Sequence, residues 1–416
     1  MKKTYKVNSL YDKLIWILTV LMLSSQIIYS KYSWSNLLLI TIGISIFAID
    51  NLAHNGSVIP LSMFQKILGL FVLYGFITSI WSISPSDSLS FSITLLYVLA
   101  SISLIYSHYK RYNDIEPLKS VIIWSSIILA LYSFYSFGFN GLIESSRSYH
   151  KRILDAFTNV NTISMFCALG IVLQFEKFLN ERKINFQLLF VPLEVFLVAC
   201  LQSRKALSII LIGSIMLLVL HNYKRKHIFS SFFKIVISLL VIIMIFYFLL
   251  ELEIFEGMNE RFLGLLSIFS NKSQVDSSSQ TRMALFNAGV DIWRQYPIQG
   301  IGIGCSHFMV NRYLGIDTYL HNNYIELLCN TGTIGMSIYY SLHLYILINL
   351  IKYRKNNIRK FNLGITWILI TLLMDFGSVS YYERDNIFYL MCQFINVQLL
   401  REDSEDGKLD DKKSVY

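Results

Sequence analysis

Long apolar runs alternate with short polar stretches along most of the chain. A helix needs about 20 mostly apolar residues to cross a bilayer, and stretches of roughly this kind recur throughout the sequence. They lie near residues 14–29, 36–49, 67–81, 89–106, 121–137, 162–178, 186–201, 206–220, 235–250, 324–350, 363–379 and 387–400. The pattern predicts an all-α polytopic membrane protein with about twelve transmembrane helices.

Two of the polar intervals on the predicted outer side are long, at residues 138–161 and 251–323. A long segment in an otherwise compact bundle usually has a function of its own or is disordered. The chain is therefore divided into transmembrane helices one to nine (1–250), a large extracytoplasmic loop (251–323), transmembrane helices ten to twelve (324–400) and a polar cytoplasmic tail (401–416).

Part of the large loop has a helical pattern. Four apolar residues recur at helical spacing after Thr281, namely Met283, Phe286, Val290 and Trp293. A helix with one apolar face is expected to lie on the membrane surface. Pro297 and Gly300 should end this helix, because neither continues a regular helix comfortably.

Composition excludes a soluble protein. Of the 416 residues, 54% are hydrophobic and 15% are charged, whereas about 25% charged residues are usual in soluble domains. The same apolar content excludes a disordered chain. The five cysteines have no metal-binding or disulfide spacing, so we expect neither a metal nor a cofactor.

The distribution of basic residues orients the helices. With a cytoplasmic N-terminus, 24 of the 36 Lys and Arg residues fall on the cytoplasmic side, as the positive-inside rule predicts. Both termini are therefore expected in the cytoplasm. The basic runs at 222–227 and 352–360 are interpreted as membrane anchors, so the net charge of +9 does not indicate a nucleic-acid partner.

The few outer bases are candidates for chemistry. Arg204 and Lys205 form a short outer turn without an acid beside them, which favours a buried counter-anion such as a diphosphate over snorkelling to headgroups. Arg282 is expected in the first turn of the surface helix, where a cation opposes the helix dipole. Either an anion bound at that helix end or a lipid headgroup would account for it.

A similar basic cluster, Arg147, Lys151 and Arg152, lies in the other long outer segment. It precedes Asn159 and Asn161, and either asparagine can cap the sixth span. The cluster is therefore a second place where an anionic substrate could bind.

Polar residues also gather where the large loop enters the tenth span. His321 can act as an acid, a base or an anion contact, although taken alone a boundary histidine is the simpler explanation. Asn322 or Asn323 can cap the helix that follows. Glu326 lies within its first turns, where an acid is costly unless it is paired or serves a site.

Other polar features have simpler explanations. Gly300, Gly302 and Gly304 lack the preceding strand and the lysine of a phosphate-binding loop, so a tight re-entrant turn with N–H groups available to an anion is the better interpretation. Glu194 and Asp375 lie inside spans, where they either pair within the bundle or have a function.

Taken in order, these motifs resemble the O-antigen ligase and repeat-unit polymerase (Wzy-type) family of bacterial membrane proteins. The matching segments are AFTNVN before the sixth span, SRKAL at the eighth, TRMALFNAGVDIWRQYPIQGIGIG in the large loop and HNNYIELLCNTGTIG before the tenth. The most specific part runs from Arg282 to Gly335. The first segment departs from the family pattern, which more often has Gly before the Phe and Pro-Asn at the end.

The resemblance implies a metal-independent, inverting glycosyltransferase at the outer face of the bacterial cytoplasmic (inner) membrane. Its donor would be an undecaprenyl-diphosphate-linked oligosaccharide, polymerised as repeat units into a capsule, exopolysaccharide or O-antigen. A chain-length regulator and a flippase of the same pathway are candidate partners beside the lipid bilayer.

The resemblance also implies roles for individual residues. Arg204, Lys205 and Arg282 would bind the diphosphate, and His321 would act with Arg282 in catalysis, either as a base or as a phosphate contact. Further candidate substrate contacts are Arg147, Arg152, Asn161, Asn322 and Glu326.

Two alternatives stay open. A ligase would use the same donor and motifs but transfer the glycan to an acceptor lipid. A membrane transporter of a lipid-linked sugar would also fit the number of spans. Against a transporter stand the long outer loop and the absence of paired spans broken by Gly or Pro.

Overall fold

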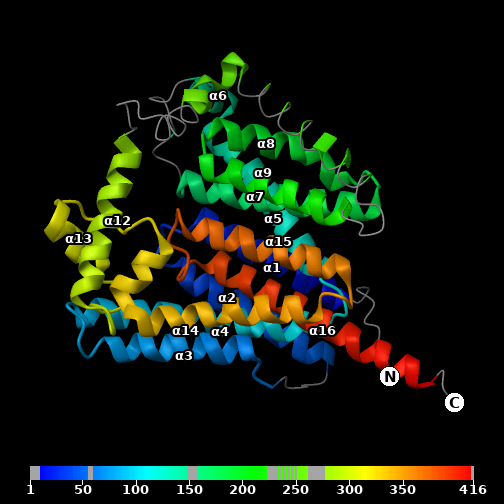
Figure 1. Cartoon of the computed structure of the whole chain (residues 1–416), viewed down its shortest axis with the longest axis horizontal. Coiled ribbons are helices and arrows are strands. Elements are labelled where there is room, and N and C mark those ends of the chain that lie inside the picture. Colours follow the sequence, from blue (N-terminus) through cyan, green and yellow to red (C-terminus); the bar gives the residue numbers. More distant parts are fainter. Residues whose placement is uncertain are drawn as a thin grey trace.

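The computed structural model arranges the chain as a bundle of long helices (Figure 1). It describes residues 10–54, 60–147, 153, 157–222, 251–260 and 277–413, with scattered positions between 230 and 248. Within these residues every regular element is a helix. The predicted all-α class is therefore confirmed.

Most of the bundle helices run along the long axis of the molecule (Figure 1). They are α1 (Leu10–Ile28), α2 (Ser35–His54), α3 (Met63–Thr78), α4 (Pro85–Tyr109), α5 (Glu116–Phe137), α7 (Val160–Glu181), η2 (Phe186–Phe190) with α8 (Val191–Cys200), α9 (Arg204–Asn222), α14 (Asn323–Tyr353), α15 (Ile358–Asp375) and α16 (Arg384–Lys413). The other elements are α6 (Phe139–Arg147), η4 (Glu253–Phe255), α12 (Ser277–Gln295) and α13 (Ser306–Leu314).

Seven of the described helices are long and apolar enough to cross a membrane, namely α1, α2, α4, α5, α7, α9 and α14. The helix α3 and the η2–α8 segment are apolar but shorter. Each predicted span overlaps a helix except the ninth, which falls largely outside the described residues. The chain is a multi-pass membrane protein, while twelve spans and the sidedness of the loops stay predictions.

Polar caps determine where several helices begin. The side chain of Asn159 accepts the N–H of Asn161 at the start of α7, and that of Asn357 accepts the N–H groups of Arg359 and Lys360 at the start of α15. Each cap satisfies backbone donors that have no partner inside the helix. Asn159 is thus the cap of the sixth predicted span.

The helix α14 is interrupted at Gly332, whose φ is 63° and ψ is −170°. Residues 297–302 pack against α14 at this break and form hydrogen bonds with its backbone on both sides of Gly332. The N–H of Thr333 donates to the Pro297 carbonyl at 2.9 Å, and the N–H of Gly302 donates to the Asn330 carbonyl at 3.0 Å. These bonds replace helical ones, so the broken backbone stays satisfied. The apolar pattern of the tenth predicted span gives no sign of this break. It interrupts a single helix, and not the pair of broken helices that is typical of transporters.

The glycine-rich turn has a structural role. The N–H of Ile301 donates to the Cys329 carbonyl at 2.9 Å, and the N–H of Ile303 donates to Thr78 Oγ1 at 3.1 Å. Gly304 lies against the ring of Phe91 in α4. The N–H groups of Ile301, Gly302 and Ile303 are therefore engaged within the protein, which corrects the interpretation that this turn offers them to an anion.

The helix α12 stands steeply across the bundle axis at the end where α14 begins (Figure 1). Leu285 and Ile292 are buried in a small core shared with α13 and the start of α14. Met283 and Phe286 remain exposed, at 63% and 40%, as an interfacial helix requires. Because α12 begins at Ser277, Arg282 lies in its second turn and not in its first. Its charge therefore lies beyond the first turn, to which the effect of the helix dipole is confined.

Candidate functional site

A cavity of about 400 Å³ lies where the ends of several helices meet. Its wall comes from the end of α1, the first turns of α7 and α9, the loop before α14 and the connection between α15 and α16. Helix termini present both polar side chains and unpaired backbone groups. Because several helix ends meet here, the cavity is lined largely by polar groups, and it lies beside the motifs predicted from the sequence.

Three of the residues predicted from the sequence line this cavity: Lys205, His321 and Asn161. They belong to α9, to the loop before α14 and to α7, which lie far apart in the sequence. The fold therefore brings together the SRKAL, HNN and AFTNVN motifs. Asn161 Oδ1 accepts a hydrogen bond from Ser203 Oγ at 3.4 Å, which joins the starts of α7 and α9.

His321 has a left-handed backbone conformation, with φ of 55°. Its ring lies 4.1 Å, centroid to centroid, from the ring of Tyr319. Burial, followed by the positive charges of Lys205 and Arg282, lowers the pKa of His321 to about 4. The imidazole is therefore neutral at pH 7, and it can either accept a proton from a hydroxyl or donate a hydrogen bond to a phosphate oxygen.

Arg282 reaches this site from α12. Its positive charge lowers the pKa of His321 and opposes the rise in the pKa of Tyr319, a rise caused chiefly by burial. Arg282 is half-buried. Lys205 and Arg282 thus place two positive charges around one histidine.

Two other predicted contacts hold the loop that carries His321. Asn322 is the N-cap of α14, since its side chain accepts the N–H of Ile325 at 3.1 Å. Glu326 is buried, and its Oε2 accepts the N–H of Leu320 at 2.8 Å while its Oε1 accepts from Asn330 Nδ2 at 3.0 Å and from Ser306 Oγ. Neither side chain lines the cavity. Both instead fix the backbone on either side of His321.

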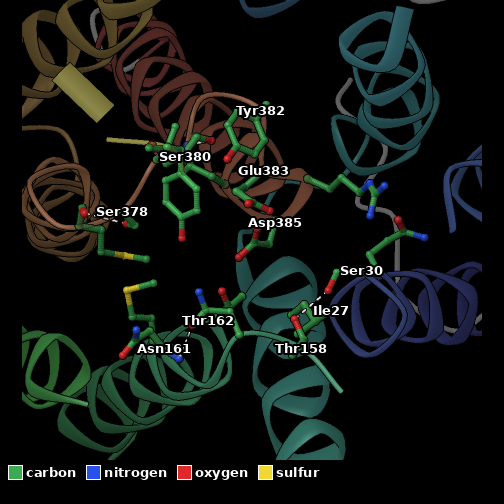
Figure 2. A pocket seen from close by; sticks show the side chains of 18 of the residues that line it. Ile27, Ser30, Thr158, Asn161, Thr162, Ser378, Ser380, Tyr382, Glu383 and Asp385 are labelled. Carbon is green, nitrogen blue, oxygen red and sulfur yellow. Dashed lines mark hydrogen bonds between the residues drawn. The ribbon is translucent and has the colours of Figure 1, made fainter. Parts of the chain in front are cut away.

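One wall of the cavity, which was not predicted from the sequence, carries two carboxyls and an arginine. Glu383, Arg384 and Asp385 connect α15 to α16 and line the cavity. Figure 2 shows the Glu383 and Asp385 side chains pointing into the space above Thr162. Burial, followed by the negative charge of Asp385, raises the pKa of Glu383 above its usual range.

The signal for this wall was present in the sequence. Three consecutive charged residues stand in the short outer interval between the eleventh and twelfth predicted spans. Charged residues of a membrane protein that face the interior of the bundle or a water-filled cavity commonly mark a substrate pathway. Lys31, which follows α1, also lines the cavity and is, like Arg384, one of the few bases on the predicted outer side.

The remaining predicted residues lie elsewhere. Arg204 is the first residue of α9 but does not line the cavity. Arg147 is exposed at the end of α6, and Lys151 and Arg152 fall outside the described residues. The predicted basic cluster of the first long segment is therefore not part of the described cavity.

The two acids inside spans are paired within the bundle. Glu194 accepts a hydrogen bond from Gln174 Nε2 at 2.7 Å. Asp375 accepts one from the Tyr340 hydroxyl at 2.8 Å and another from Ser380 Oγ. For Asp375 these contacts favour the simpler of the two explanations, in which buried polar groups satisfy one another. Glu194 is satisfied only in part, because its Oε1 has no hydrogen-bond partner among the described residues.

The fold and the cavity define a multi-pass helical membrane protein with a site of mixed charge at one end of its bundle. Residues 188–340 match a family model described as O-antigen ligase. The match confirms the predicted resemblance to the O-antigen ligase and Wzy-type family, and it spans Lys205, Arg282 and His321. No curated protein matches the chain.

Proposed function

We propose that the chain joins undecaprenyl-diphosphate-linked repeat units into a surface polysaccharide at the outer face of the bacterial cytoplasmic membrane. The observation that carries this proposal is the convergence of Lys205 and His321 in one cavity, with the charge of Arg282 acting on the same histidine. A diphosphate attached to a lipid reaches such a site from the bilayer, and cations at the end of a bundle are suited to hold it.

The two cations supply binding and transition-state stabilisation. Negative charge grows on the diphosphate as its bond to the anomeric carbon breaks, and fixed charges aimed at such a group are commonly worth a few kcal/mol. Lys205 is proposed as the contact on α9 in place of its neighbour Arg204, because Lys205 lines the cavity. His321 either takes the proton of the attacking hydroxyl or holds a phosphate oxygen.

The reaction proposed is a single displacement without a metal, which inverts the anomeric carbon. Side-chain cations would perform the charge neutralisation that a divalent ion performs in other phosphate chemistry. A chain-length regulator and a flippase acting on the same lipid-linked substrate are the proposed partners.

The ligase alternative fits the family match equally well, because ligase and polymerase share their donor. They differ in the acceptor, which is an acceptor lipid for a ligase and a second lipid-linked repeat unit for a polymerase. A glycan gel of a deletion strain separates them. Loss of a polymerase leaves single-unit chains, whereas loss of a ligase leaves long chains on the carrier lipid.

The transporter alternative has a different test. Purified protein in vesicles that moves a lipid-linked sugar across the bilayer without lengthening it would support transport. Lengthened product would support polymerisation, and no observation on the described residues favours transport over transfer.

The proposed function is tested with Arg282→Ala and His321→Ala in a strain that lacks the native protein. Both variants should insert into the membrane yet give only single-unit product. Matched controls are Arg294→Ala, an exposed arginine of α12 that pairs with Asp291, and His307→Ala, which pairs with Asp317 on the surface. The controls should give full-length polymer. Full-length polymer from Arg282→Ala and His321→Ala would exclude the proposed site.

A further inference from the structure

The cavity is lined by cationic groups from one set of elements and by two carboxyls from another, which are called here its basic and acidic sides. Lys205 and His321 come from α9 and the loop before α14, with the charge of Arg282 added from α12. Glu383 and Asp385 come from the connection between α15 and α16. A transfer reaction must both stabilise a departing anion and remove a proton from the incoming hydroxyl, and these two tasks need opposite charges.

The electrostatics oppose a proton transfer to His321. A proton placed on this imidazole would add positive charge beside Lys205 and Arg282, as the lowered pKa of His321 reflects after the effect of burial. A base works best when its pKa lies near the working pH. His321 is therefore better suited to donate a hydrogen bond to the diphosphate.

The two neighbouring carboxyls favour uptake of a proton by one of them. Glu383 lines the cavity beside Asp385, and a proton on one carboxyl relieves the repulsion between two negative charges. Within the described residues, no side chain donates a hydrogen bond to the Glu383 carboxyl. It is therefore available to a substrate hydroxyl.

The two carboxyls are not equivalent. Asp385 lies in the first turn of α16, and the backbone N–H of Asn386 stabilises its negative charge. Glu383 is the residue just before the helix, and among the described residues no backbone N–H donates to its carboxylate. The proton is therefore better accommodated on Glu383.

We propose that Glu383 is the general base that activates the acceptor hydroxyl and that Asp385 tunes it; this inference rests on the proposed function. The acceptor oxygen forms a bond to the anomeric carbon while the bond from that carbon to the phosphate oxygen breaks. The diphosphate leaves with the electron pair of that bond. The hydroxyl proton passes to the Glu383 carboxylate and from there to water.

Several charged or titratable groups face Glu383 and would shape its pH dependence. They are Asp385, Arg384 and Tyr382 from its own connection, Tyr319 and His321 from the loop before α14, Lys205 from α9 and Lys31 after α1. The variants Glu383→Gln, Glu383→Asp and Asp385→Asn alter the acidic side and leave the cations in place. Glu144→Gln removes an exposed carboxyl on α6 and is the matched control.

The experiment uses the purified full chain with a radiolabelled undecaprenyl-diphosphate-linked repeat unit, and measures donor binding, turnover and the pH profile of kcat/KM. Glu383→Gln should lower turnover by about 100-fold or more while donor binding stays within about two-fold of wild type. Glu383→Asp should recover part of the loss. Asp385→Asn should move the acidic limb of the profile to lower pH, because removal of the like charge lowers the pKa of Glu383.

The outcomes separate the inference from the proposed function. Lengthening by wild type together with undiminished turnover of Glu383→Gln would overturn the base assignment alone. An unshifted acidic limb in Asp385→Asn would also overturn it, even if Glu383→Gln failed to fold. A wild-type protein that binds the donor but forms no glycosidic bond would overturn the proposed function and, with it, this inference.

Discussion

The carboxylate of Glu326 accepts the backbone N–H of Leu320, the residue next to His321, at 2.8 Å. The same carboxylate accepts from Asn330 and Ser306. One buried side chain of α14 thus joins the loop that carries His321 to α13 and to the segment of α14 just before its break. The position of His321 therefore depends on Glu326, although Glu326 itself does not line the cavity.

Glu326→Gln should therefore impair both stability and activity. The amide of Gln offers one acceptor oxygen in place of two, so a buried donor loses its partner at a cost of about 1–3 kcal/mol. We expect a lower unfolding temperature in detergent and reduced turnover with a smaller effect on donor binding. Turnover and unfolding temperature equal to those of Glu144→Gln would contradict this role.

The break in α14 leads to a second prediction. Gly332→Ala places a Cβ 2.1 Å from the Ile298 carbonyl oxygen, at a φ of 63°. The left-handed conformation alone costs about 1 kcal/mol or more for a residue other than Gly, and the overlap forces residues 297–302 away. We expect poor membrane accumulation and a strongly lowered unfolding temperature.

Gly141→Ala is the matched control for Gly332→Ala. Nothing lies within 4 Å of the position of its added Cβ, and Gly141 is inside the helix α6. Alanine should be neutral or stabilise the protein by up to about 1 kcal/mol there. Equal behaviour of the two variants would show that the break is not required for the fold.

The helices were the most predictable part of the fold, because membrane-spanning segments need long apolar runs that are visible in the sequence. Their ends were less predictable. The apolar run that begins near Phe186 contains both a 3-10 turn and a short helix, and the break at Gly332 depends on residues 297–302 approaching it. Hydropathy carries no information about such a contact between distant segments.

The site was predictable only in part. Lys205 was predicted because few basic residues fall on the predicted outer side, and His321 because an imidazole can act as an acid, a base or an anion contact. Both line the cavity. Glu383 and Asp385 were not predicted, because the acids chosen from the sequence lie inside the predicted spans, whereas these two lie in a short polar interval between spans. Arg204 and Lys205 were indistinguishable in the sequence, since only the rotation of α9 decides which of two neighbours faces the cavity.

The lowered pKa of His321 leads to a third prediction. Burial, Lys205 and Arg282 disfavour its protonated form, so the pKa should rise from about 4 towards the ordinary 6.5 when a cation is removed. In Lys205→Gln the imidazole should therefore protonate at higher pH than in wild type. Diethyl pyrocarbonate, which reacts with neutral imidazole, measures this change when the signal of His321→Gln is subtracted. Coincident pH profiles for wild type and Lys205→Gln would show that the two residues do not interact.

A bound diphosphate should move the same titration in the same direction. Its negative charge offsets the two cations and favours the protonated imidazole. Addition of inorganic diphosphate to wild type should therefore shift the diethyl pyrocarbonate profile to higher pH, and Lys205→Gln should need more diphosphate for the same shift. A profile that diphosphate leaves in place would argue that the anion binds away from His321.

The neighbours Arg204 and Lys205 allow the sharpest test of where the donor binds. Both carry one positive charge at the start of α9, so long-range attraction of an anionic lipid should be similar for each. Only Lys205 lines the cavity, where its side chain passes over Gly377. Lys205→Gln should therefore raise the KM for the lipid-linked donor by about ten-fold or more, the effect of losing about 1.4 kcal/mol of binding, while Arg204→Gln should change it much less. The KM of both variants should be measured at low and at high salt. High salt screens the long-range attraction that Arg204 and Lys205 share, so the difference that remains reports direct contact with the donor. A larger loss in Arg204→Gln at high salt would place the diphosphate outside this cavity.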